Sequence, residues 1–176
     1  MNPSEIEATF LAKHRLPEPI VDICRFVETH GYPISGCFEI SEIGMRDVAG
    51  WFKNDEAAQA ALLPFGRGAC GDIYAIWLTD GLSPAEAPVI MLGSEGQLEV
   101  LAVTSAEFCR LLCLGYSEIG LEELDADPTD YEETKRFRDY IQAKYHFDFP
   151  PTASPIVEKA RGLFPTFAAW VAEHQK

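Results

Sequence analysis

Hydrophobic residues recur at helical spacing near both ends of the chain. In residues 18–30 the apolar positions repeat as they do on one face of an amphipathic helix, and Gly31 before Tyr32-Pro33 supplies a stop signal. Pro3-Ser4 can start a short helix ahead of it. The same spacing predicts a helix that starts at 128–130 and runs to about residue 145, and another over 164–174. Helices therefore flank whatever occupies the middle of the chain.

The middle of the chain carries short runs of strand-forming residues separated by turn signals. These runs are 37–43, 62–65, 73–79, 88–92 and 98–103. Asp80-Gly81 and Ser94-Glu95-Gly96 lie between runs and are typical turn residues. Such short connections favour antiparallel hairpins.

Two further helices are expected around the strands. Thr104 or Ser105 can cap a helix over 106–114, which Gly115 ends. Asn54 can cap a short alanine-rich helix over 55–62, whereas residues 45–52 fit no element clearly.

Helices before and after a run of strands predict an α+β fold with a central antiparallel β-sheet meander flanked by N-terminal and C-terminal helices. A length of 176 residues suits a single domain spanning 1–176, and neither a repeat nor a domain linker is evident. Residues 150–155 are expected to be an arm that leads to the last helix.

The net charge is −14, and its distribution is uneven. Residues 68–134 contain fourteen acidic residues and a single basic one, Arg110. Such a field repels phosphates, which argues against direct nucleic-acid binding, and it attracts a basic protein partner. The alternative that the acids only keep the chain soluble remains open.

Five cysteines lie in apolar surroundings, and they predict reduced core thiols and a cytoplasmic location: Cys24, Cys37, Cys70, Cys109 and Cys113. The apolar runs are shorter than the roughly 18–20 residues of a membrane span, and the N-terminus lacks the features of a secretory signal. A soluble protein without membrane association is therefore expected.

No motif predicts a catalytic, cofactor or metal site. The GxGxxG pattern of 66–71 leads into a strand instead of a helix, so its glycines indicate a tight turn or bulge. Cys109 and Cys113 share a helix face and are interpreted as core thiols. Asp125 and Asp127 lie in a stretch that lacks the central glycine of a calcium loop. The four histidines are isolated, and no nucleophile motif is present.

Three stretches, in order, resemble the SMI1/KNR4 family, also called the SUKH superfamily. They are Leu16-Pro17 leading to His30-Gly31, Leu63-Pro64-Phe65-Gly66 followed by Gly71 to Ile76, and residues 88–103 followed by a capped helix that contains Phe108. The resemblance covers about residues 16–115. It leaves 116–176 as a helical C-terminal extension without a counterpart.

The resemblance implies a non-catalytic protein-binding domain. Many bacterial members are immunity proteins that bind and block a toxin, often a nuclease or a deaminase, and fungal relatives act as interaction proteins. Gly71 and Asp72 match the family motif and are interpreted as structural residues, Gly71 for its backbone conformation and Asp72 for hydrogen-bonding the turn.

The acidic stretch after residue 116 is the predicted partner-binding surface. Its candidate residues are Glu118, Glu122, Glu123, Asp125, Asp127, Asp130 and Tyr131. Buried aromatic anchors would add affinity, and the candidates are Tyr116, Tyr131, Trp51 and Trp77, the last of which is expected in the core. The expected partner is a basic toxin domain. The alternatives are a regulatory interaction module without a toxin partner and a small enzyme with an unrecognised site.

Overall fold

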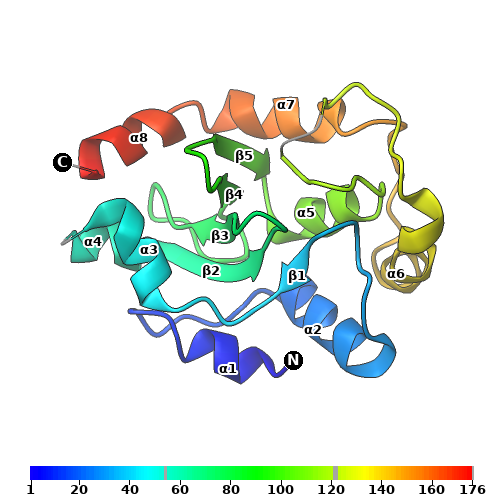
Figure 1. Cartoon of the computed structure of the whole chain (residues 1–176), viewed down its shortest axis with the longest axis horizontal. Helices are drawn as coiled ribbons and strands as arrows, with labels where there is room; N and C mark the ends of the chain where they lie inside the picture. The colour runs from blue at the N-terminus through cyan, green and yellow to red at the C-terminus, as the bar shows by residue number, and fades with distance from the viewer. Residues whose placement is uncertain (54, 121–122, 176) are drawn as a thin grey trace.

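The computed structural model describes residues 1–53, 55–120 and 123–175. The described residues form an α+β fold of five strands and eight helices (Figure 1). In chain order the elements are α1 (Pro3–Glu7), α2 (Glu18–His30), β1 (Glu39–Ile40), α3 (Met45–Phe52), α4 (Glu56–Ala60), β2 (Leu62–Arg67), β3 (Ile73–Trp77), β4 (Val89–Leu92), β5 (Leu98–Ala102), α5 (Ser105–Leu112), α6 (Tyr131–Tyr145), α7 (Ser154–Leu163) and α8 (Phe167–His174).

The five strands form one antiparallel sheet in the order β1-β2-β3-β4-β5, which confirms the predicted meander. Tyr74 of β3 lies opposite Met91 of β4, and the neighbouring hairpins continue the same pattern of sequential pairing. The register of β2 and β3 shifts between Pro64 and Gly66, so the first glycine of the GxGxxG pattern lies at a bulge.

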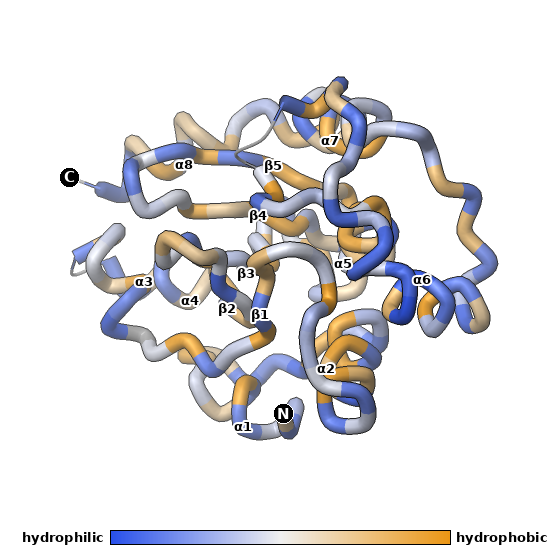
Figure 2. Tube along the Cα trace, turned by 45° about the vertical axis from the view of Figure 1, so that its right-hand side comes forward, coloured by the Kyte–Doolittle hydropathy of each residue, from blue (hydrophilic) through white to orange (hydrophobic). Residues whose placement is uncertain are grey.

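Both faces of the sheet are buried, and β3 shows this most clearly. Tyr74 and Ile76 point into a first core, which α1, α2, α5 and α6 close from one side. Ile73, Ala75 and Trp77 point into a second core, closed by α3, α4 and α8. Because the two faces alternate along a strand, burial of both produces an uninterrupted apolar run. Hydrophobic positions accordingly concentrate in the strands and in α2, whereas α6 is mostly hydrophilic (Figure 2).

The prediction that residues 150–155 form only an arm is corrected by the structure, in which helix α7 already begins at Ser154. Pro155 lies in the first turn of α7, where the N–H that proline lacks would have no helical partner. The helix packs along β5, the last strand of the sheet (Figure 1). Ile156 and Val157 join the first core and Ala160 joins the second. The helix thereby covers a sheet edge that would otherwise be open to other strands.

Other differences from the predicted elements are small. The run 37–43 forms a strand only at Glu39–Ile40, residues 45–52 form the helix α3, and the last helix begins at Phe167. Asn54 lies outside the described residues. The N-cap of α4 is Asp55, whose carboxylate accepts the Ala58 N–H at 2.9 Å.

Three of the five cysteines are buried as expected, and two are not. Cys24, Cys109 and Cys113 lie in the first core, and burial raises the pKa of the Cys24 thiol to about 11. Cys37 and Cys70 are exposed, because each lies in a turn that connects elements across the surface. The expectation that all five are core thiols is therefore wrong for these two.

A buried carboxylate joins the C-terminal part of the chain to the N-terminal part. Asp22 of α2 is 2% exposed; it accepts the Tyr145 hydroxyl at 2.7 Å and an Arg25 N–H at 3.0 Å, and it pairs with Lys144 of α6. Burial raises the pKa of this carboxyl, but the hydrogen bonds from Lys144, Tyr145 and Arg25 outweigh burial and leave the pKa below its ordinary value. The ionised form therefore stabilises the contact between α2 and α6.

Replacement of Asp22 by Asn should lower the free energy of unfolding at neutral pH by about 2 kcal/mol, because charge-assisted hydrogen bonds are lost in a buried place. Since the folded-state pKa is lowered, this stabilisation is present above the unfolded pKa of about 3.9 and is lost as the pH falls through the folded-state pKa. Urea unfolding of the wild-type protein and of Asp22→Asn should show a difference in the free energy of unfolding, and this difference should narrow below about pH 4.

The matched control is Asp139→Asn, which breaks the exposed Lys135–Asp139 pair on the surface of α6. It should leave the urea midpoint of unfolding unchanged at neutral pH and below about pH 4. Equal losses for the two variants would contradict the role assigned to Asp22.

Candidate functional site

The predicted acidic stretch forms a loop whose two ends meet. This acidic loop, residues 116–130, of which the structure describes 116–120 and 123–130, follows α5 and Gly115 and leads into α6 at Tyr131. The Asp130 N–H donates to the Gly115 carbonyl at 2.8 Å. Gly115 has a φ of +91°, and a Cβ there would lie 2.9 Å from the backbone of Asp130 and Tyr131. Glycine is therefore required where the loop closes.

Buried tyrosine hydroxyls hold the inner side of the acidic loop. The Tyr116 hydroxyl donates to the Ala126 carbonyl at 2.8 Å and accepts the Ala153 N–H, at the start of α7, at 2.9 Å. From β3, the Tyr74 hydroxyl donates to the Ile119 carbonyl at 2.9 Å. Tyr116 is only 2% exposed, so the expectation that it could anchor a partner is wrong. It fastens the loop from inside instead.

The carboxylates that the sequence singled out differ in exposure. Glu123, Asp125 and Asp127 are exposed, whereas Glu118 and Asp130 are half-buried. Glu122 lies outside the described residues. Tyr131, the remaining candidate, is 43% exposed.

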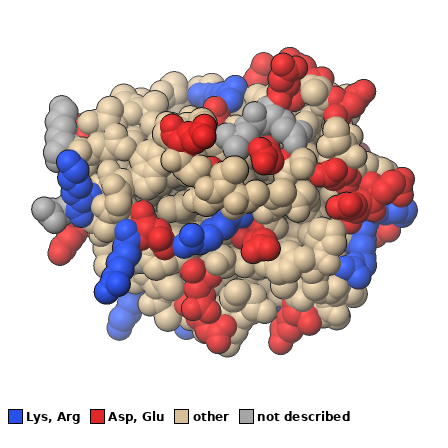
Figure 3. Space-filling view, in the orientation of Figure 1, with Lys and Arg blue, Asp and Glu red and all other residues tan. Residues whose placement is uncertain are grey.

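Acidic side chains gather toward the upper right and the right of Figure 3, where Figure 1 places the acidic loop and α6. Among the described residues, none of the carboxylates of Glu123, Asp125, Asp127 and Asp130 forms an ion pair with a basic side chain.

Elsewhere in the acidic window of the sequence, the fold supplies counter-charges. Lys159 of α7 pairs with Glu107 at 2.7 Å, and Arg161 pairs with Glu99 at 2.5 Å. The basic C-terminal third thus neutralises part of the window, whereas Glu123, Asp125 and Asp127 form no ion pair within the described residues. This difference within one acidic stretch is invisible in the sequence.

A groove of about 300 Å³ opens beside the acidic loop. We call it the proline–aromatic groove; it is lined by Leu114, Pro128, Tyr131, Arg138, Phe149, Pro150 and Pro151. Its walls come from the loop, from α6 and from the segment that follows α6.

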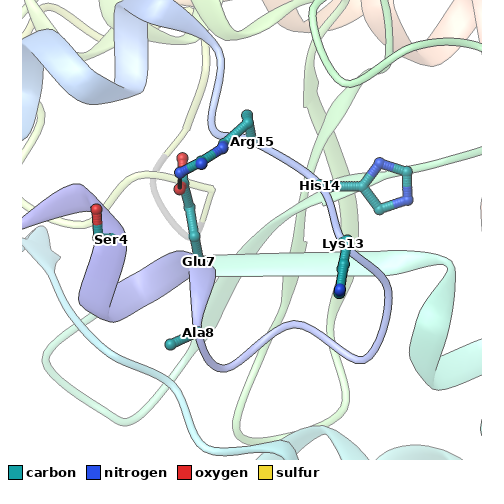
Figure 4. Close-up of a pocket in the computed structure, with 6 residues that line it drawn as sticks. All are labelled: Ser4, Glu7, Ala8, Lys13, His14 and Arg15. Atoms are coloured by element: carbon teal, nitrogen blue, oxygen red, sulfur yellow. Dashed lines mark hydrogen bonds and ion pairs between the residues drawn. The ribbon is translucent and has the colours of Figure 1, made fainter.

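A second hollow, of about 270 Å³, lies beside α1 (Figure 4). Its lining includes Lys13, His14 and Arg15. Arg15 turns toward Glu7 and pairs with it at 2.5 Å, whereas the His14 ring points away from this pair (Figure 4). The side chains of Lys13, His14 and Arg15 therefore do not converge on one point.

The other aromatic candidates lie away from the acidic loop. Trp77 is 1% exposed and lies in the second core, as expected. Trp51 of α3 is half-buried against that core, and α3 and the acidic loop lie toward opposite ends of the long axis of the molecule (Figure 1).

Gly71 and Asp72 lie at the turn that leads into β3. Gly71 has a φ of +91°. The buried carboxylate of Asp72 accepts the Ser94 N–H at 2.9 Å. The backbone carbonyl of Asp72 accepts the Gly68 N–H at 3.0 Å. The side chain thus connects this turn to the turn between β4 and β5.

Chemistry-bearing groups are scattered elsewhere in the fold. Within residues 1–53, 55–120 and 123–175, no group of three or more His, Cys, Asp or Glu side chains is placed to hold a metal ion. Cys109 and Cys113 are both buried, and burial raises the pKa of each thiol. No helix of the described residues is long and apolar enough to cross a bilayer.

No protein-family model, curated protein or solved structure matches the chain. The resemblance to SMI1/KNR4 proteins therefore rests on the sequence motifs quoted above.

Sequence reasoning missed that Arg138, Phe149, Pro150 and Pro151 line a groove beside the acidic loop. Tyr131 and Arg138 are seven residues apart on α6, which places them on one side of the helix and could have paired them. Phe149 follows a turn in which His146 has the left-handed φ of 52°. The sequence of that turn did not predict this conformation, and the return of the chain toward Arg138 was therefore not predicted.

Tyr116→Phe should loosen the acidic loop, because the Ala153 amide loses its hydrogen-bond acceptor and the Ala126 carbonyl loses its donor. We expect a loss of about 1–2 kcal/mol in the free energy of unfolding. Hydrogen exchange should speed up at Ala153, whose amide loses its acceptor, and at Ser154, whose amide bonds to the Leu124 carbonyl at 3.1 Å.

Tyr32→Phe is the control, because the Tyr32 hydroxyl bonds to Ile40, in another part of the fold. It should leave exchange at Ala153 and Ser154 unchanged. Unaltered exchange at those two amides in Tyr116→Phe would show that the hydroxyl does not hold the loop.

Proposed function

We propose that this protein is a non-catalytic, cytoplasmic binding protein that presents its acidic loop to a protein partner with a basic surface. The observation that carries the proposal is the set of exposed carboxylates on Glu123, Asp125 and Asp127, which have no basic partner among the described residues. Hydrogen bonds hold the loop that carries them, so binding would order few additional groups.

The chemistry of the loop favours a basic protein over other partners. Clustered carboxylates repel nucleic-acid phosphates and speed the encounter with a positively charged surface. Enzymes that act on nucleic acids present such surfaces to bind phosphates. An acidic loop can occupy the same surface by offering carboxylates in place of phosphates.

The narrower proposal is an immunity protein that neutralises a toxin of nuclease or deaminase type by binding it. Its support is the SMI1/KNR4 resemblance of residues 16–115 together with the acidic loop, which follows that part directly in the chain. In this arrangement the SMI1/KNR4-like part supplies the scaffold, and the C-terminal extension supplies the contact surface.

Affinity capture from the native cell lysate, at low and at high salt, would identify the partner. A stoichiometric basic protein that is retained at low salt and released at high salt would support charge-steered binding. If that protein is a toxin whose activity is lost in the complex, the immunity proposal is supported. A non-toxic basic partner would favour a regulatory interaction module.

With the partner identified, the variant Glu123→Gln/Asp125→Asn/Asp127→Asn should associate about tenfold more slowly at low salt, because steering depends on these charges. The dependence of the association rate on salt should also become shallower. Stopped-flow or surface-binding kinetics at several salt concentrations would measure both effects.

A charge-matched control removes the same number of carboxylates elsewhere, by Glu28→Gln/Glu95→Gln/Glu158→Gln. All three residues are exposed and lie outside the loop. This control should change the association rate much less, and equal slowing by the two variants would reduce the effect to net charge alone.

A further inference from the structure

The proline–aromatic groove is small. Its volume of about 300 Å³ is at the lower end of the range of about 300–1,000 Å³ typical of ligand pockets. Leu114, which is 2% exposed, forms the floor. Pro128 of the acidic loop and Pro150 and Pro151 also line it, and prolines have little conformational freedom to lose on binding.

The cation in the groove is held by aromatic rings. The Arg138 guanidinium lies 4.0 Å from the centre of the Phe149 ring and 5.0 Å from that of the Tyr131 ring. Among the described residues it forms no ion pair. A flat aromatic side chain can stack on a guanidinium held in this way, whereas a lysine side chain would meet a like charge.

Three carboxylates neighbour residues that line the groove: Asp127 precedes Pro128 in the chain, and Asp130 and Glu132 flank Tyr131. We call these three residues the acidic rim. None of these three carboxylates forms an ion pair within the described part of the chain. The charge pattern therefore runs from a cationic–aromatic centre to an anionic rim.

We propose that the groove receives an aromatic side chain of the partner, flanked in the partner's sequence by lysine or arginine residues that reach the acidic rim. This inference rests on the proposed function and specifies the segment that the acidic loop recognises. A second copy of this chain is a poor occupant, because its net charge of −14 would bring acidic surface against acidic surface.

Two labelled peptides of nine residues test the proposal. One has a central tryptophan between two pairs of lysines, and the other has alanine in place of the tryptophan. In fluorescence anisotropy at low salt, the tryptophan peptide should bind about tenfold more tightly, as expected when an aromatic ring is buried against a guanidinium. Amide NMR shifts on binding should centre on residues 128–138 and 149–151.

Variants separate the centre of the groove from its rim. Tyr131→Ala and Arg138→Gln should each bring the affinity ratio of the two peptides close to one. Asp127→Asn/Glu132→Gln should weaken both peptides and preserve the ratio. Leu163→Ala, which shortens a 58% exposed apolar side chain on α7, should change neither affinity nor ratio.

The outcomes distinguish this inference from the proposed function. Equal, salt-dependent binding of the two peptides would overturn the groove as an aromatic site and leave the acidic surface standing. Failure of both peptides to bind folded protein at low salt would count against the acidic surface as well. Sedimentation that shows a dimer of the wild-type protein, lost in Tyr131→Ala, would assign the groove to a second copy and overturn the inference.

Discussion

A sheet that buries both of its faces needs helices on both, and β3 imposes this requirement here. Its side chains alternate between two cores, with Tyr74 directed to one and Trp77 to the other. The N-terminal helices cover only part of the first face. The C-terminal helices α6, α7 and α8 must therefore return to the sheet, and the extension beyond residue 115 is part of the core.

This return of the chain determines where charge remains uncompensated. Helix α7 brings Lys159 and Arg161 to carboxylates of the central region, and α6 brings Lys144 to Asp22. In the acidic loop, by contrast, the exposed carboxylates of Glu123, Asp125 and Asp127 form no ion pair among the described residues. Lys144, Lys159 and Arg161 of the extension are paired with carboxylates in other parts of the fold instead.

The strands could be predicted from the sequence because each is a short apolar run bounded by turn residues, and burial on both faces keeps the run continuous. The α+β class followed from the order of these elements. Helix α7 could not be predicted as easily, because Pro155 indicates a break when it is considered alone and supports a helix only in the first turn.

The acidic loop could be located from composition, but its internal order could not. Tyr116 has the residue type of a partner anchor, yet its ring is buried and its hydroxyl bonds to Ala126 and Ala153. Which face an aromatic residue presents depends on contacts with segments far along the chain. The acidic window of residues 68–134 also overstated the charge of the surface, because Glu99 and Glu107 form ion pairs with bases of α7, far along the chain.

A surface that is acidic throughout attracts any basic protein, and it distinguishes poorly among them. Charge sets how fast partners meet, whereas a buried anchor sets how long they stay. In the function that we propose, the acidic loop and the proline–aromatic groove would divide these two tasks between adjacent surfaces. The cation of Arg138 sharpens the division, because a lysine-rich segment that lacks an aromatic residue finds attraction at the rim and repulsion at the centre. Selectivity among basic partners would then come from the groove, and speed of association from the loop.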